Sequence, residues 1–146
     1  MEIGLNQITE ILPHRDPFLF PTRVTTDAET ASGEGYIDFS SLQPIWNSTF
    51  DRSIEQKQEL LLESAAQIFG VVLASQSKKE NSDTQDEKHL LLGFEKIKFP
   101  NSIKPSSEIR ITTKLIGNFG QMYKAEIKAE TGNQIIMSGI LSVLKG

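Results

Sequence analysis

In the apolar segment ELLLESAAQIFGVVL, residues 59–73, Glu63 stands between three leucines and a long apolar run, and it is the first side chain that suggests chemistry. Polar or small residues recur at helical spacing along this segment and just before it: Gln56, Glu59, Glu63, Gln67 and Gly70. Such a stripe is the solvent side of an ordinary helix, or it faces a crevice or a partner subunit. In a crevice, a half-buried Glu63 could exchange protons near neutral pH. The spacing alone leaves both interpretations open.

Other catalytic side chains are scarce. The 146 residues contain no cysteine, which excludes a thiolate nucleophile, a disulfide framework and a cysteine-based metal site. Histidine occurs only at His14 and His89, and no group of residues has metal-ligand spacing. Gly33 and Gly35 lack the spacing of a phosphate-binding loop. We therefore expect neither a metal nor a cofactor.

Length and composition indicate one globular domain, residues 1–146. The content of 38% hydrophobic and 23% charged residues is ordinary for a domain with a proper core. The net charge of −4 argues against a nucleic-acid partner. The N-terminus lacks the basic start and long apolar segment of a signal peptide, and no apolar run approaches the roughly 20 residues that cross a bilayer. We expect a soluble, cytoplasmic protein with no membrane partner.

The hydrophobic pattern predicts one long helix among strands. A short first helix should have Asn6 as its N-cap and end before Pro13. A second helix, from about Glu55 to Ser75, is apolar on so many sides that other structure must wrap it. We expect a loop at 41–53 and an exposed polar connection at 76–89. Strands are expected at 17–25, 33–40, 89–99, 108–117, 122–131 and 134–144, with turns at 117–120 and 131–133.

One buried helix early in the chain and antiparallel strands late in it favour an α+β fold. In this fold an antiparallel sheet wraps around one long central helix. Such a sheet leaves exposed edges, and pairing across a dimer is a common way to cover them. We therefore expect the protein to be at least a dimer.

Three segments resemble motifs of one enzyme family. ITEILPHRDPFLF, residues 8–20, is similar to the N-terminal signature of the bacterial (3R)-hydroxyacyl-acyl-carrier-protein dehydratases. LLLESAAQ, residues 60–67, resembles their core helix, and LLGFEKIKFPNSIKPSSEI, residues 91–109, resembles the strand and turn that follow. The segments keep the family order and span nearly the whole chain. The resemblance implies the hot-dog fold, a sheet wrapped around one long helix, with one continuous sheet formed by a dimer.

The resemblance also implies an activity in fatty-acid biosynthesis. In this family the acyl chain of a thioester enters a tunnel at the dimer interface. A histidine of one subunit and an acidic residue on the helix of the other remove water across the α and β carbons. Glu63 falls on the acidic position, and Gln67 falls on the family glutamine four residues later. The resemblance therefore favours a stripe that faces the interface crevice rather than bulk water.

The sequence departs from the family at the histidine. Counting back from Glu63 places Thr49 at the histidine position, while Phe50 matches the family phenylalanine that follows. A threonine hydroxyl is far too weak a base to replace an imidazole. Gln58 replaces the glycine whose backbone N–H approaches the thioester carbonyl at the start of the helix. We assign Glu63 and Thr49 to the catalytic positions, and Phe50, Gln58 and Gln67 to substrate binding.

Three hypotheses for function remain open. The first is a dehydratase-like protein that binds 3-hydroxyacyl or enoyl thioesters without full activity alone, either as a homodimer or as the non-catalytic half of a mixed dimer with another hot-dog protein. The second is a thioesterase in which Glu63 acts as base or nucleophile. The third is an active dehydratase with a substitute for the histidine; the resemblance gives His14 a structural role, and His89 is expected at the surface. Acyl chain length, and acyl carrier protein versus coenzyme A, stay open.

A group of cations has two interpretations as well. Lys96, Lys98, Lys104 and Arg110 lie on or beside predicted strands. They form a solvated strand face, or they form a docking patch, because the family takes its substrates from an acidic carrier protein.

Overall fold

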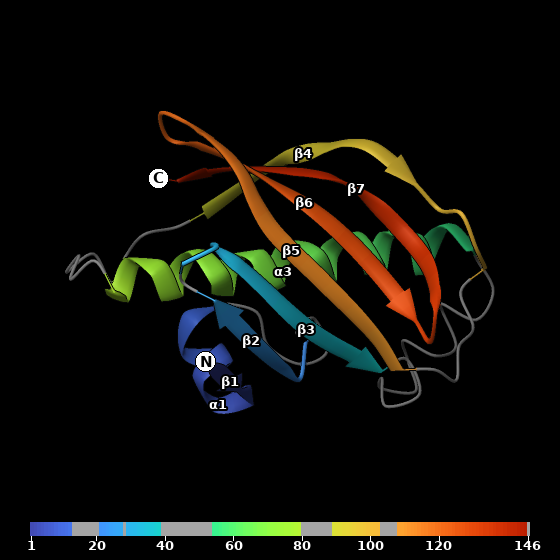
Figure 1. The fold of residues 1–146 in the computed structure, drawn as a ribbon, viewed down its shortest axis with the longest axis horizontal. Helices are drawn as coiled ribbons and strands as arrows, with labels where there is room; N and C mark the ends of the chain where they lie inside the picture. The colour runs from blue at the N-terminus through green and yellow to red at the C-terminus, as the bar shows by residue number, and fades with distance from the viewer. Residues whose placement is uncertain (13–20, 28, 39–53, 80–88, 103–107, 146) are drawn as a thin grey trace.

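One antiparallel sheet lies across a long helix in the computed structural model of the chain (Figure 1). The structure describes residues 1–12, 21–27, 29–38, 54–79, 89–102 and 108–145. The elements in chain order are β1 (Glu2–Gly4), α1 (Leu5–Ile11), β2 (Arg23–Asp27), β3 (Ser32–Asp38), α3 (Ile54–Lys79), β4 (His89–Lys98), β5 (Glu108–Phe119), β6 (Met122–Thr131) and β7 (Gln134–Lys145). Within these residues the sheet has seven strands in the order β1-β2-β3-β5-β6-β7-β4. The α+β class and the wrapped helix are as predicted.

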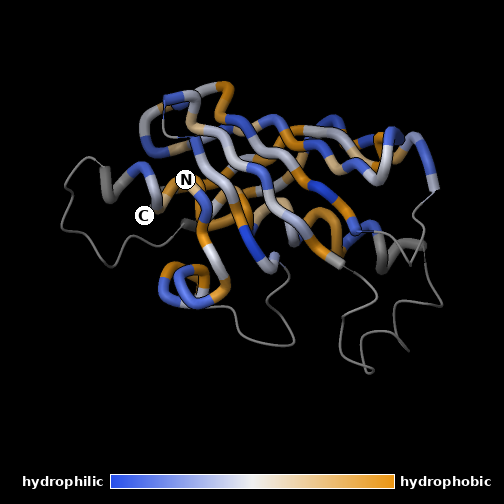
Figure 2. Tube along the Cα trace, turned by 60° about the horizontal axis from the view of Figure 1, so that its bottom comes forward, coloured by the Kyte–Doolittle hydropathy of each residue, from blue (hydrophilic) through white to orange (hydrophobic). Residues whose placement is uncertain are grey.

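The helix α3 is long because its sequence favours a buried helix over 26 residues. Leu61, Ile68 and Phe69 are fully buried, as are other apolar residues on several sides of the helix axis. α3 packs mainly on β2, β3 and β5. The tube in Figure 2 alternates between hydrophilic and hydrophobic colours along the strands, as a sheet with one covered face requires. The core therefore lies between α3 and one face of the sheet.

Register fixes which residues face the helix. On β5, Ile109, Ile111 and Thr113 are buried, while Arg110 and Lys114 between and after them are exposed. We call the face covered by α3 the inner face and the opposite one the outer face. Opposite residues on neighbouring strands share a face, so this parity can be followed through the pairing from β2 to β4.

The N-terminus differs from the prediction. Glu2–Gly4 form a short strand that pairs with β2, and Gly4 rather than Asn6 is the N-cap of the first helix. Gly4 has an extended backbone, and its N–H donates to Gln7 Oε1 at 3.3 Å. Three residues are too short for strand alternation to be recognised in a sequence. The burial of Ile3, only 2% exposed, shows that the strand belongs to the core.

Two predicted connections were placed wrongly. The polar connection predicted at 76–89 begins later than expected, because α3 continues to Lys79, while β4 begins at His89 as predicted. Gln and Lys are good helix formers, and lysines interact favourably with a helix C-terminus. The turn at 117–120 lies later, at Gly120 and Gln121, where Gly120 has a φ of 65°. Gly117 belongs to β5, next to a register shift between Leu115 and Gly117.

The first predicted strand, 17–25, corresponds to β2, which begins at Arg23 and continues to Asp27, and the other elements follow the prediction. The second predicted strand is β3, and the last four predicted strands are β4 to β7, within a few residues at each end. The predicted loop at 41–53, the N-terminal part of the first predicted strand and His14 lie outside the described residues.

Candidate functional site

The polar stripe of α3 passes from the surface into the protein. Glu59 is exposed, Glu63 is half-buried, and Gln67 one turn later is only 2% exposed. At Gly70 the helix is covered by Leu12, the residue that follows α1. The Cδ2 atom of Leu12 lies 3.2 Å from the point where a Cβ atom at position 70 would stand. The solvent-side interpretation of the stripe is therefore wrong at Gln67. Glu63 lies at the border between the exposed and the buried part.

The surroundings of Glu63 on the helix are those of a core helix. The next residue, Ser64, is fully buried, and its hydroxyl donates to the carbonyl of Leu60 at 2.7 Å. Leu60 and Leu61 are also buried. The helix backbone that carries Glu63 is therefore well packed, which is a precondition for a positioned acid or base.

The other predicted site residues are only partly brought together. Gln58 is half-buried on α3, five residues before Glu63, which puts it about 140° away around the helix axis. Glu63 and Gln67, four residues apart, share one face. Thr49 and Phe50 lie outside the described residues, so their place beside Glu63 stays a prediction.

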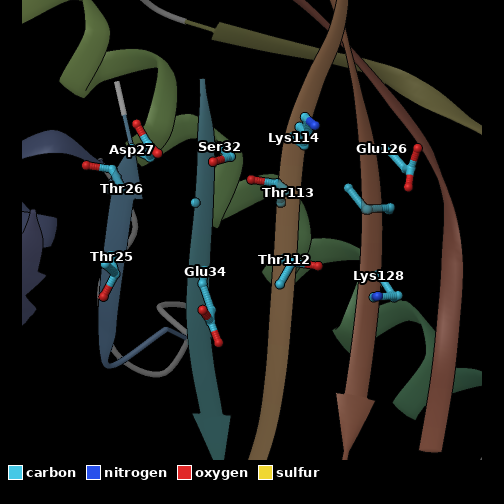
Figure 3. Close-up of a pocket in the computed structure, with 12 residues that line it drawn as sticks. Thr25, Thr26, Asp27, Ser32, Glu34, Thr112, Thr113, Lys114, Glu126 and Lys128 are labelled. Atoms are coloured by element: carbon cyan, nitrogen blue, oxygen red, sulfur yellow. The ribbon is translucent and has the colours of Figure 1, made fainter. Parts of the chain in front are cut away.

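The structure also has a shallow groove that the sequence did not predict, on the outer face of the sheet (Figure 3). Its outward side chains come from two cross-strand rows of paired residues: Thr25, Glu34, Thr112 and Lys128 in one, and Asp27, Ser32, Lys114 and Glu126 in the other. These residues alternate with buried ones along β2, β3, β5 and β6. The groove lies on the opposite face from α3 and is walled by charged and hydroxyl groups. Among the described residues that line it, Ile127 is the one large apolar side chain, whereas an acyl chain is usually held between several apolar and aromatic side chains.

Ion pairs link the strands on this outer face. Arg110 contacts Glu34 at 3.3 Å and Glu130 at 3.2 Å, and Lys128 contacts Glu130 at 3.1 Å. The hydrogen bond from Lys128, with a smaller effect of Arg110, holds the pKa of Glu130 below its ordinary value. Arg110 is therefore engaged within the sheet, which weakens its assignment to a docking patch.

The other cations of the predicted docking patch differ among themselves. Lys96 and Lys98 are exposed on β4, and Lys104 lies outside the described residues. Nearby, Lys124 contacts Glu95 at 2.6 Å and, by hydrogen bond and charge, lowers the pKa of Glu95. Among the described cations of the patch, Lys96 and Lys98 thus lie on β4, while Arg110, which is also exposed, lies on β5 within the ion-pair network.

The described residues contain neither a candidate metal site nor a helix that could span a membrane. Over these residues there is no group of three or more His, Cys, Asp or Glu side chains placed to hold a metal ion. None of the helices in the described ranges has the length and apolar character needed to cross a membrane.

Solved structures with the same architecture define the class of protein. The dehydratase heterocomplex ApeI:P from Xenorhabdus doucetiae matches with a TM-score of 0.70 at 15% identity, over 95% of this chain and 90% of that chain. A hot-dog-like protein from Thermanaerovibrio acidaminovorans matches with a TM-score of 0.61 at 10% identity, over 79% and 80% of the two chains. The chain has a hot-dog fold.

Sequence similarity then gives the family. The 3-hydroxyacyl-acyl-carrier-protein dehydratase FabZ of Streptococcus thermophilus is 31% identical over 149 aligned residues, which cover 100% of this chain and 99% of that protein. The FabZ of Streptococcus mutans is 30% identical over 99% of both chains. No family model matches the chain. The full-length similarity shows that the chain belongs to the FabZ dehydratase family, as its motifs predict.

Proposed function

We propose that this protein binds 3-hydroxyacyl or enoyl thioesters, carried by acyl carrier protein or coenzyme A, in cytoplasmic fatty-acid metabolism. The thioester would lie beside Glu63 and Thr49, with Phe50, Gln58 and Gln67 around it. The observation that carries the proposal is full-length similarity to FabZ together with a stripe on α3 that turns inward between Glu63 and Gln67.

Of the two catalytic groups that a dehydration needs, the chain has a candidate for the acid but none for the base at the family position. The reaction needs a base that removes the α-proton and an acid that protonates the departing β-hydroxyl. Glu63 can serve as that acid from a well-packed helix position. Thr49 stands where the family has its base, and a neutral hydroxyl does not remove such a proton at useful rates. Alone, the protein should therefore bind its substrate and turn it over slowly.

Assembly can supply the missing base. In the family the histidine and the acid belong to different subunits, so a mixed dimer with a histidine-bearing hot-dog protein would bring an imidazole to Glu63. A dehydratase heterocomplex with this fold exists, so the fold allows such an assembly. In that dimer this chain contributes the acid of one site, and the other site, built around Thr49, stays silent.

Substrate binding and dehydration activity can be measured separately, and each tests a different part of this proposal. Calorimetric titration with an enoyl thioester of coenzyme A should show saturable binding, while the absorbance of the enoyl thioester should show dehydration far slower than by a FabZ enzyme. Absence of binding, to this probe and to an acyl carrier protein thioester alike, would remove the proposal. Release of free thiol from the same substrate, lost in Glu63→Gln and retained in Glu59→Gln, would put the thioesterase hypothesis in its place.

A further inference from the structure

Apolar side chains form a row across the outer face of the sheet at one of its ends. Along β6 the buried Ala125 and Ile127 are on the inner face, so Met122, an odd number of positions from both, is on the outer face. Residues that pair directly across neighbouring strands share a face. The pairing extends the row from Met122 to three further residues: Phe119 on β5, Leu144 on β7 and Leu90 on β4. Phe119 and Leu90 are both 62% exposed, so the row is open to its surroundings.

The row continues onto the connection between β5 and β6. This connection stands clear of the rest of the sheet at the upper left of Figure 1. A Cβ atom at Gly117 would lie 2.9 Å from Cε2 of Phe119, so the phenyl ring lies back over this glycine. Ile116, at the register shift between Leu115 and Gly117, is 50% exposed. We call this group of side chains the apolar tip: Leu90, Ile116, Phe119, Met122 and Leu144.

Charged residues of β5 and β6 begin only behind the apolar tip. The segment 115–123 carries no charge, and the residue that flanks it on each side is a lysine, Lys114 and Lys124. Lys124 contacts Glu95 at 2.6 Å, whereas the exposed Lys114 has no ion-pair partner among the described residues. Glu95 and Glu126 lie one outer-face row further from the tip than Lys124, level with Lys114. On these strands the charge nearest to the apolar tip is therefore a cation.

The size and chemistry of the apolar tip favour a lipid surface over a protein partner. A stable protein interface takes about 20–30 residues from each side, and the apolar tip is far smaller. A bilayer surface requires no matching surface of its own. Exposed apolar side chains enter the boundary between headgroups and acyl chains, while lysines behind them reach the phosphates. The cations next to the apolar tip complement anionic headgroups.

We propose that the apolar tip binds the surface of an anionic phospholipid bilayer. Phe119 and Ile116 insert between the headgroups, and Lys124 and Lys114 lie at the phosphates. The proposal is independent of the proposed function, because it concerns where the chain is held rather than what binds beside Glu63. The sequence-based expectation of no membrane partner rested on the lack of a spanning segment, which a peripheral contact does not use.

The sheet limits how deeply the apolar tip inserts. The backbone groups of an open strand edge are not tolerated in the hydrocarbon region, and β4, which carries Leu90, pairs only with β7 among the described strands. Asn118 and Gln121, beside the tip, are polar and exposed. The tip therefore reaches the headgroup boundary and no further, and the binding of one chain should be weak and reversible.

Co-sedimentation of the full chain with vesicles tests the proposal. Vesicles of phosphatidylglycerol and phosphatidylcholine in equal parts should carry the protein into the pellet, more of it as lipid is added. Ile116→Ser should weaken this binding about tenfold, because a large apolar side chain no longer leaves water. Ile135→Ser is the matched control and should bind like the wild type, since Ile135 is also exposed but lies at the opposite end of β7 from Leu144.

Tryptophan fluorescence identifies the side chains that enter the bilayer. Phe119→Trp should be quenched by phosphatidylcholine that is brominated on its acyl chains, and Ile135→Trp should not. The signal of the single native tryptophan, Trp46, is measured in the wild type and subtracted.

The headgroup contact has its own pair of variants. Lys114→Gln should weaken binding to the anionic vesicles about fivefold and leave binding to pure phosphatidylcholine unchanged, because the cation acts on the charge of the headgroups. Lys98→Gln is the control, since Lys98 is exposed at the far end of β4 from Leu90, and it should change neither.

Three results would overturn the proposal. The first is a wild-type chain that stays in the supernatant at every lipid concentration, and the second is equal binding of Ile116→Ser and Ile135→Ser. The third is a smaller sedimentation coefficient for Ile116→Ser than for the wild type without lipid, which would assign the apolar tip to a protein interface instead. Urea midpoints equal to that of the wild type show that each variant is folded, and Phe119→Ser replaces Ile116→Ser if that variant fails this check.

Discussion

Ile68 Cδ1 lies 2.5 Å from the point where a Cβ atom at position 35 would stand. Real Cβ atoms do not approach another carbon so closely, so α3 rests on β3 at a distance that only glycine permits. Val72, one turn further along α3, packs in the same way over Gly33. The two glycines are two residues apart on the inner face, and the helix residues are four apart on one side. The two contacts therefore allow α3 to approach β3 more closely than any residue with a Cβ atom at positions 33 and 35 would permit.

The first prediction concerns this contact. Gly35→Ala should destabilise the protein by about 1–3 kcal/mol, the usual cost of overpacking a core, because the new methyl group must displace Ile68 or the helix. Urea unfolding monitored by circular dichroism measures the effect. In a double-mutant cycle, Gly35→Ala/Ile68→Ala should be less destabilised than the two single variants together. Additive losses would show that Ile68 is not the obstacle.

The second prediction concerns the residue at the histidine position. Positioned acid–base catalysis contributes about 10²–10⁴ in rate, and Thr49 cannot supply it. Thr49→His should therefore raise the dehydration of a (3R)-hydroxyacyl thioester, followed by enoyl absorbance, although Gln58 in place of a glycine limits the recovery. Thr49→Gln, which adds bulk without an imidazole base, is the matched control and should not gain activity.

Brisk dehydration by the wild-type chain would contradict that expectation. The base would then have to be one of the two histidines of the chain, His14 or His89. Single replacement of each by glutamine in the wild type would identify it.

The third prediction concerns Glu63 in a mixed assembly. When the chain is combined with a histidine-bearing family member whose own acidic residue has been replaced, the imidazole and Glu63 should restore dehydration together. Glu63→Gln should abolish the gain while leaving co-purification of the two chains intact, because the amide keeps the shape but donates no proton at the departing hydroxyl. Glu59→Gln, one turn away and exposed, should retain the gain. Equal activity of both variants would remove Glu63 from the mechanism.

Much of the fold could be predicted because its signals are local. The alternation along β5 to β7 and the dense apolar pattern of α3 each fix an element without reference to its neighbours. β1 could not be found, because a strand of three residues is defined by its pairing with β2. The register shifts of β4 against β7, between Leu91 and Gly93 and between Glu95 and Lys98, could not be found either, because they are defined by the pairing of two strands.

The candidate site was only partly predictable for a related reason. Sequence periodicity places Glu63 and Gln67 on the same face of the helix, but it does not show how burial changes along that face. Burial varies along this face, since Leu12 covers Gly70 and Gln67 lies inside, while Glu59 remains in water. The motif resemblance identified the correct family, because several short motifs in a fixed order are far more specific than any one carboxylate.

The last prediction concerns pH and the outer face. Lys128 and Arg110 hold the pKa of Glu130 below its ordinary value of 4.5 in the folded chain. A lowered folded pKa means that this stabilisation is complete above the unfolded value and is lost as the pH falls through the folded value. The free energy of unfolding should therefore decrease between about pH 5 and pH 3 by more in the wild type than in Glu130→Gln. The difference should be about 0.2–1 kcal/mol, since these ion pairs are partly solvated. Lys128→Met should lose most of the same pH dependence, and the double variant should lose little more, because the two residues act on one ion pair. Urea midpoints measured across this range provide the test, and parallel curves for wild type and Glu130→Gln would show that the network contributes nothing to stability.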